Sequence, residues 1–189
     1  MQLGIEATRS ESSEAAVWSD VQSIVSGVVS ASALGLAWAA RAGPSVMVMH
    51  AIGMMGVVAG TAMLSVVPLW VLALHLGLAL RADTLLAIVA RAIRVTGIVL
   101  LGLSPTVALV SITAESVVTV GLVGLSAIAL GGALGLRTFS VELDRAVGGA
   151  PFGRASWVKS GIFLFAALAA LRLGWTLLPI VRAGFGGSS

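Results

Sequence analysis

The two histidines are the side chains with the clearest potential for chemistry. His50 and His75 are the only histidines of the 189-residue chain, and both lie in a run of 39 residues without a charge, 42–80. A b-type haem is held by two imidazoles that face each other at one depth. If the run forms two antiparallel helices, the histidines share a depth and predict a haem site. If it forms one helix, 25 residues separate them by about 37 Å, and they cannot share an iron.

Arg172 is the second residue with a potential role, because it lies about twelve residues into the last apolar stretch. A charge inside the bilayer costs at least about 2.5–3.5 kcal/mol, so it needs a partner or a route to the headgroups. Glu115 is the acidic residue that we expect on the same side, and we predict an Arg172–Glu115 ion pair. The alternatives are that Arg172 contacts an anion or a quinone, or that it snorkels beside Trp175.

Other catalytic signals do not occur in the sequence. The chain has no cysteine, which excludes thiol catalysis and thiolate-bound clusters. HExxH, a glycine-rich phosphate loop followed by lysine, and GxSxG do not occur. Basic residues are scattered singly, unlike a nucleic-acid footprint. We therefore predict no catalytic residue, no metal site and no nucleic-acid partner, and a protein that is more readily a non-catalytic subunit than an enzyme.

The composition places the protein in a membrane. Hydrophobic residues make up 58% of the chain and charged residues 10%, whereas soluble domains are about a quarter charged. Backbone groups in lipid must satisfy one another, which leaves helices or a closed barrel. Apolar runs near 20 residues favour helices over the alternating segments of a barrel. The fold class is therefore all-α, a polytopic integral membrane helix bundle.

The apolar stretches also set the number of spans. Four of them have the length of one span: 21–40, 95–112, 116–136 and 160–181. The charge-free run would measure about 58 Å as one helix, against a hydrocarbon core of about 30 Å. We predict that it forms a hairpin turning near 61–67, which gives six transmembrane helices and places Trp70 at the interface. The alternative is one helix bent at Pro68, which gives five.

The ends of the chain differ from its centre. Residues 1–20 carry four acidic residues against Arg9, which does not fit the basic start of a signal peptide. We predict an acidic, mobile N-terminal tail over 1–20, a single transmembrane domain over 21–182, and a short flexible tail over 183–189.

The positions of the basic residues predict the topology. The loops 81–94 and 137–159 hold seven of the eleven basic residues, and the loop 113–115 holds none. The positive-inside rule therefore places the two basic loops in the cytoplasm and the C-terminus outside. The N-terminus lies inside with five spans and outside with six. Ten arginines against one lysine indicate a GC-rich bacterial genome, and hence the bacterial inner membrane.

Small residues spaced by four predict faces where helices pack closely. They are Gly27, Ala31 and Gly35, then Gly56 and Gly60, then Gly131 and Gly135.

One segment carries a family resemblance. His75-Leu76 through Arg81, followed by the amphipathic stretch Leu85 to Arg94, resembles the Yip1-type membrane proteins when read with the five-span layout. The resemblance implies a membrane-organising or trafficking role.

Taken together, these features predict a non-catalytic subunit or assembly scaffold of a larger membrane complex. Its expected partners are the lipid bilayer and other membrane subunits or a second copy of the chain, and no cofactor is expected. The alternatives are a b-type haem electron-transfer subunit that uses His50 and His75, and a small transporter or channel. The scarcity of polar residues in the predicted spans argues against transport.

Overall fold

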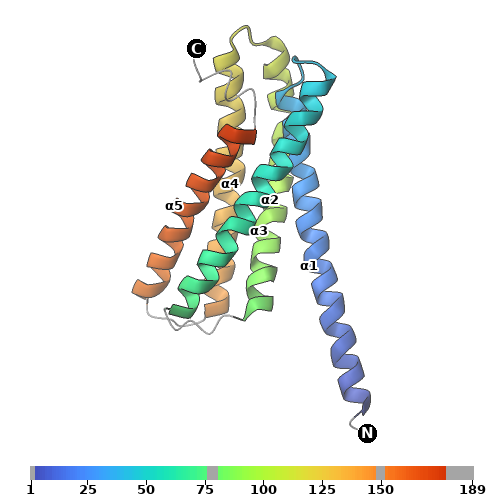
Figure 1. The fold of residues 1–189 in the computed structure, drawn as a ribbon, viewed down its shortest axis with the longest axis vertical. Helices are drawn as coiled ribbons and strands as arrows, with labels where there is room; N and C mark the ends of the chain where they lie inside the picture. Colours follow the sequence, from blue (N-terminus) through green and yellow to red (C-terminus); the bar gives the residue numbers. More distant parts are fainter. Residues whose placement is uncertain (1–2, 76–80, 148–151, 178–189) are drawn as a thin grey trace.

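The computed structural model describes residues 3–75, 81–147 and 152–177, which form an antiparallel bundle of long helices (Figure 1). The helices are α1 (Leu3–Trp38), α2 (Pro44–His75), α3 (Ala82–Thr113), α4 (Val117–Val147) and α5 (Phe152–Leu177). Helix α1 packs along α2 and α3, α4 packs along α3, and α5 packs along α2. Helices α4 and α5 touch only slightly.

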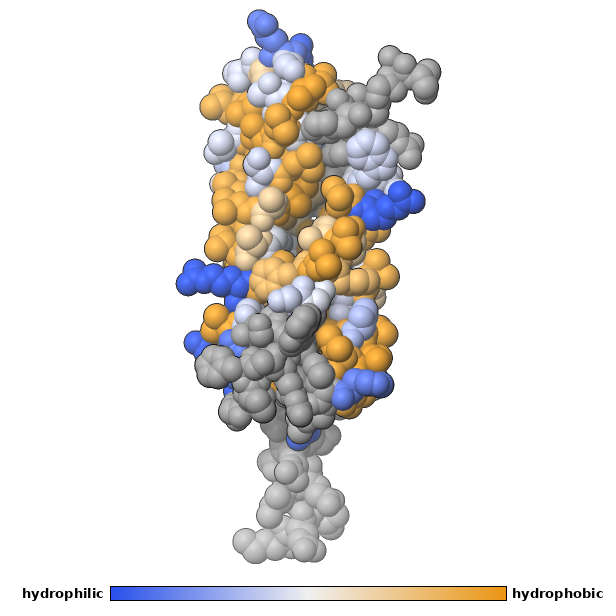
Figure 2. Space-filling model, turned by 90° about the vertical axis from the view of Figure 1, so that its left-hand side faces the viewer, coloured by the Kyte–Doolittle hydropathy of each residue, from blue (hydrophilic) through white to orange (hydrophobic). Residues whose placement is uncertain are grey.

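The all-helical fold class is confirmed. Within the described residues there are helices and no strands, and four helices are long and apolar enough to cross a bilayer. They are Val17–Trp38, Pro44–Leu72, Ala82–Thr113 and Val117–Val147, and a shorter apolar segment, Phe163–Leu177, lies in α5. The surface in Figure 2 is correspondingly apolar over most of the described face, and hydrophilic positions interrupt it singly.

The predicted hairpin in the charge-free run is wrong. Helix α2 continues through residues 61–67 and through Pro68 as one element of 32 residues, about 48 Å long. A turn made of apolar residues would leave backbone donors and acceptors unpaired in lipid, whereas a continuous helix satisfies them. Pro68 removes only one hydrogen bond of this ladder.

The turn before α2 follows from two residues. Gly43 has a φ of 95°, a backbone conformation that favours glycine because it has no side chain. Pro44 then begins α2, where its missing N–H costs nothing and its fixed φ suits the first helical turn. The sequence Gly43-Pro44 thus reverses the chain between α1 and α2.

The first residues of the chain continue helix α1. The predicted mobile tail over 1–20 is helical from Leu3 onward, and α1 runs unbroken to Trp38. Figure 1 shows the N-terminal part of α1 projecting past the end of the bundle formed by the other helices.

The helices approach one another most closely at small residues. A Cβ added at Gly27 would lie 2.6 Å from the Ile93 backbone oxygen, and one added at Gly35 would collide with the His50 backbone. Ala31, between them on α1, is fully buried. These residues of α1 therefore lie directly against the backbones of α3 and α2.

Glycines on the other helices meet side chains. A Cβ at Gly131 would lie 2.7 Å from Leu100 Cδ2, and one at Gly135 would collide with the Thr96 hydroxyl. Gly56 and Gly60 face α5, where a Cβ would lie 3.1 Å from a Leu177 methyl carbon and 3.0 Å from a Leu173 methyl carbon, respectively. The structure thus places all the glycines of the predicted small-residue faces at contacts between helices.

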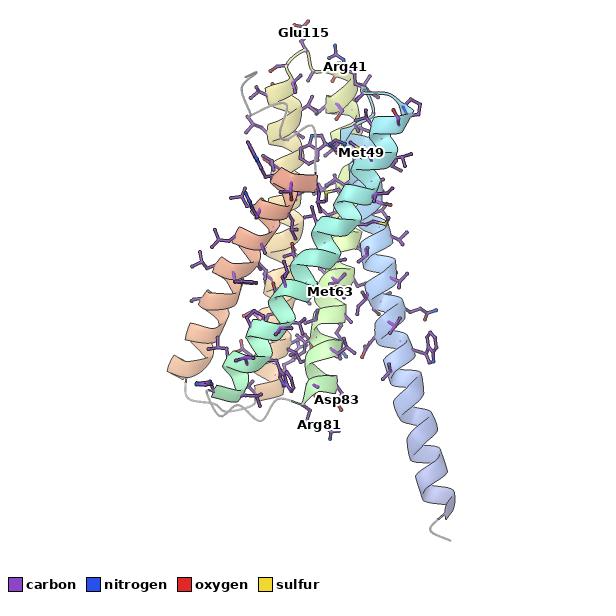
Figure 3. The ribbon with its side chains drawn as sticks, in the orientation of Figure 1. Arg41, Met49, Met63, Arg81, Asp83 and Glu115 are labelled. Carbon is purple, nitrogen blue, oxygen red and sulfur yellow. The ribbon has the colours of Figure 1, made fainter. Side chains whose placement is uncertain are left out.

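The two ends of the bundle carry different groups. Arg41 and Glu115 lie at one end, and Arg81 and Asp83 lie at the other (Figure 3). Arg41 Nη1 donates a hydrogen bond of 2.8 Å to the Ala114 carbonyl oxygen, which ties the α1–α2 turn to the α3–α4 turn. These two turns therefore lie at the same level.

Candidate functional site

The structure does not bring the two histidines together. His50 and His75 both lie on α2, 25 residues apart, which corresponds to about 37 Å along a helix. His50 is fully buried, whereas His75 is exposed. Within one chain these imidazoles cannot be the two axial ligands of one iron.

His50 instead belongs to a buried cluster near the α1–α2 turn. Its Nδ1 lies 3.2 Å from the Val46 carbonyl oxygen, and the Trp38 ring meets its ring edge-on at a centroid distance of 6.2 Å. The buried hydroxyl of Ser111 on α3 donates a hydrogen bond of 3.1 Å to the Trp38 carbonyl oxygen. Gly124 on α4 contacts the Trp38 ring. The cluster thus fastens the end of α1 to three other helices, which is a structural role.

The predicted Arg172–Glu115 ion pair is not formed. Leu173 packs at Gly60 and Leu177 packs at Gly56, so Arg172 lies level with about Thr61 on α2. From there to Pro44, at the Glu115 end of the bundle, is 17 residues, or about 25 Å. The pair fails because α5 packs on α2 in a register that leaves Arg172 far from the α3–α4 turn.

The Arg172 side chain is exposed on α5. No hydrogen bond or ion pair to its guanidinium occurs within the described residues. Its neighbours along the same helix face are large, exposed apolar side chains: Leu164, Leu168, Leu171 and Trp175. This cation therefore has no partner among the described residues, and it lies on an apolar helix surface, level with the centre of the charge-free run.

Arg81, Arg91 and Arg145 form ion pairs with acidic side chains. Glu142 on α4 accepts from Arg91 on α3 at 2.9 Å and from Arg145 at 3.0 Å, while Arg81 pairs with Asp83 at 3.0 Å. These pairs lie within the predicted loops 81–94 and 137–159, but residues 82–94 belong to helix α3 and residues 137–147 to helix α4. Glu142 couples α3 to α4 there.

A long apolar cleft lies where α4 and α5 pack loosely against each other. It has a volume of about 860 Å³ and is lined by residues of α2, α3, α4 and α5. It exists because α5 leans on α2 and scarcely touches α4. Within the part of the chain that the structure describes, its lining contains no charged residue, and its hydroxyl groups come from Thr61, Ser65 and Thr96.

Sequence reasoning did not find the cleft, the Trp38 cluster or the hydroxyl of Thr61. The Trp38 Nε1 and Thr61 Oγ1 atoms are buried without a hydrogen-bond partner. The one signal for the Thr61 hydroxyl in the sequence is a threonine within an apolar run.

Comparisons with known protein families, with characterised proteins and with solved structures find no match to this chain.

Proposed function

We propose that this protein is a non-catalytic subunit or assembly scaffold of a larger membrane complex, and that it binds its partner through the exposed face of α5. The observation that supports this proposal is Arg172, a cation that lies among exposed apolar side chains and has no partner in the described ranges 3–75, 81–147 and 152–177. A charge in that setting costs at least about 2.5–3.5 kcal/mol. A carboxylate on a neighbouring helix would remove that cost and fix the register of the two helices.

The chemistry of the face defines the partner. Leu164, Leu168 and Trp175 lie at helical spacing around Arg172, so a partner helix needs an apolar stripe with one acidic side chain at the matching level. The acidic residues of this chain lie in 1–20 and at Asp83, Glu115, Glu142 and Asp144. None of these lies in the apolar centre of a predicted span, so the partner is a different protein rather than a second copy.

The orientation follows from the same charges. We propose that α5 also crosses, giving five spans in a bacterial inner membrane. The end that carries Arg81 and the N-terminus would then face the cytoplasm, and the C-terminus would lie outside, as the positive-inside rule requires.

Site-specific photocrosslinking in native membranes tests the proposal. A photoreactive residue at Leu168, beside Arg172, is compared with one at Ile98 on α3, since the two positions are similarly exposed at 57% and 53%. We expect a discrete protein adduct from position 168 only. We also expect Arg172→Leu to abolish that adduct and Arg172→Lys to keep it.

The competing explanation is that Arg172 snorkels to lipid headgroups. In that case position 168 gives lipid adducts only, or its protein adduct survives Arg172→Leu. Either result overturns the proposed function. Arg137→Leu, which removes an exposed arginine from α4, serves as the matched control and should leave the adduct unchanged.

A further inference from the structure

We infer that the cleft between α2, α3, α4 and α5 binds a neutral lipophilic molecule that has an extended hydrocarbon body and a carbonyl group, and that the hydroxyl of Thr61 donates a hydrogen bond to that carbonyl. This site adjoins the α5 face proposed to bind a partner, since Leu171 and Trp175 line the cleft, whereas Arg172 does not.

The volume and shape of the cleft fit a chain molecule. Its volume of about 860 Å³ lies within the range of about 300–1,000 Å³ that is typical of small-molecule sites. Along α2 its lining extends from Met54 to Leu69, about 22 Å of helix. An extended hydrocarbon chain matches a cleft of this length and apolar lining.

The lining specifies a neutral ligand. Apolar side chains such as Val58, Leu125, Ile128 and Phe163 dominate it, and none of the described residues that line it is charged. A charged headgroup inside the cleft would find no counter-ion in this lining and would keep the cost of leaving water. The part of the ligand that lies in the cleft must therefore be uncharged.

The hydroxyl groups of the cleft are not equivalent. Ser65 Oγ donates to the Thr61 carbonyl oxygen at 2.7 Å, and Thr96 Oγ1 donates to the Ala92 carbonyl oxygen at 3.0 Å. Such bonds to the preceding helical turn are usual for these residues in helices. Thr61 Oγ1 is buried and has no hydrogen-bond partner, and Thr61 lines the cleft, so a turn of its side chain about the Cα–Cβ bond would offer the proton to a ligand there.

The depth of Thr61 narrows the ligand class further. Thr61 is the central residue of the charge-free run 42–80, about 25 Å along α2 from Pro44 and about 21 Å from His75. The ester carbonyls of a phospholipid lie near its headgroup and would not reach this depth while the headgroup stays in water. A neutral lipid with its carbonyl deep in the bilayer meets the requirement.

Two probes that differ only in the carbonyl test the inference. The purified protein in mild detergent is titrated with 10-nonadecanone and with nonadecane, and binding is followed by tryptophan-detected thermal unfolding and by native mass measurement. We expect the ketone to bind about two- to tenfold more tightly than the alkane, the range that corresponds to one net hydrogen bond. Thr61→Val should make the two affinities equal.

A pair of glycines supplies the control for location. Gly132 lines the cleft, Gly102 on α3 does not, and neither has an atom within 4 Å of an added Cβ. Gly132→Leu should fill the cleft and weaken the binding of both probes at least tenfold, whereas Gly102→Leu should leave binding unchanged. Because both variants replace an open helical glycine by leucine, their helix propensities change alike.

Three results would overturn the inference. They are equal affinity of the wild-type protein for ketone and alkane, unchanged binding in Gly132→Leu, and a retained phospholipid that the ketone does not displace. Arg172→Leu should leave probe binding unchanged, so failure of the proposed α5 interface and failure of the ligand site are separate outcomes.

Discussion

Gly27→Ala should loosen the contact between α1 and α3, and the structure sets the size of the effect. The added Cβ would lie 2.6 Å from the Ile93 backbone oxygen and 2.9 Å from the Arg94 Cα. Both atoms belong to the backbone of α3, so a change of side-chain rotamer cannot relieve the clash. Forcing one extra carbon into a well-packed contact costs about 1–3 kcal/mol.

Gly102→Ala is the matched control, because an added Cβ there meets no atom within 4 Å. Both variants gain about 0.5–1 kcal/mol from replacing a helical glycine by alanine. Subtracting one from the other cancels that gain and leaves the clash, about 1–3 kcal/mol. For a chain of this size that difference corresponds to about 2–12 °C in Tm.

The assay is thermal unfolding of both purified variants in the same mild detergent, followed by tryptophan fluorescence. We expect the order of stability Gly102→Ala, wild type, Gly27→Ala. Equal Tm values for Gly27→Ala and Gly102→Ala would show that α1 and α3 do not meet at Gly27, and would refute the packing described for this pair.

Three further predictions concern the ends of the bundle and the histidines. The purified protein should show no Soret band, because His50 and His75 are too far apart on α2 to hold one haem; a band lost in a histidine-to-alanine variant would contradict this. Since the chain has no cysteine, single-cysteine variants report topology: Glu115→Cys should react with an impermeant maleimide in intact cells, and Asp83→Cys only after permeabilisation, whereas the reverse pattern would invert the orientation. Glu142→Gln should lower stability by about 0.3–1 kcal/mol at low salt, with a smaller loss in 0.5 M salt; an equal loss at both salt concentrations would show that the ion pairs are not its cause.

Local patterns in the sequence were sufficient for some of the fold. The spacing of Gly27, Ala31 and Gly35 puts them on one helix face, and that face lies against α3 and α2 because only small residues allow backbones so close. Gly43-Pro44 likewise indicates a turn, since its two residues restrict the backbone in ways that suit one. In each case the cause lies within a few residues of the chain.

The errors concern relations between helices. The length of the charge-free run predicts a hairpin, yet its residues Pro44–His75 form one helix that exceeds the hydrocarbon core. The sequence pairs Arg172 with Glu115 because both lie on the predicted outer side of the membrane. The register of α5 on α2, with Leu173 at Gly60, depends on packing and tilt, which residue spacing does not encode. The cleft has the same origin, because it exists only where α5 and α4 diverge.

The size of the complex in which the protein resides tests the proposed subunit function most directly. The protein is extracted from its native membranes in mild detergent, and native mass is measured for the wild type, for Arg172→Lys and for Arg172→Leu. We predict a hetero-oligomer with a defined second protein for the wild type and for Arg172→Lys, and the 19.0 kDa chain alone for Arg172→Leu. A wild-type protein that is already monomeric, or a complex that persists unchanged in Arg172→Leu, would contradict the account.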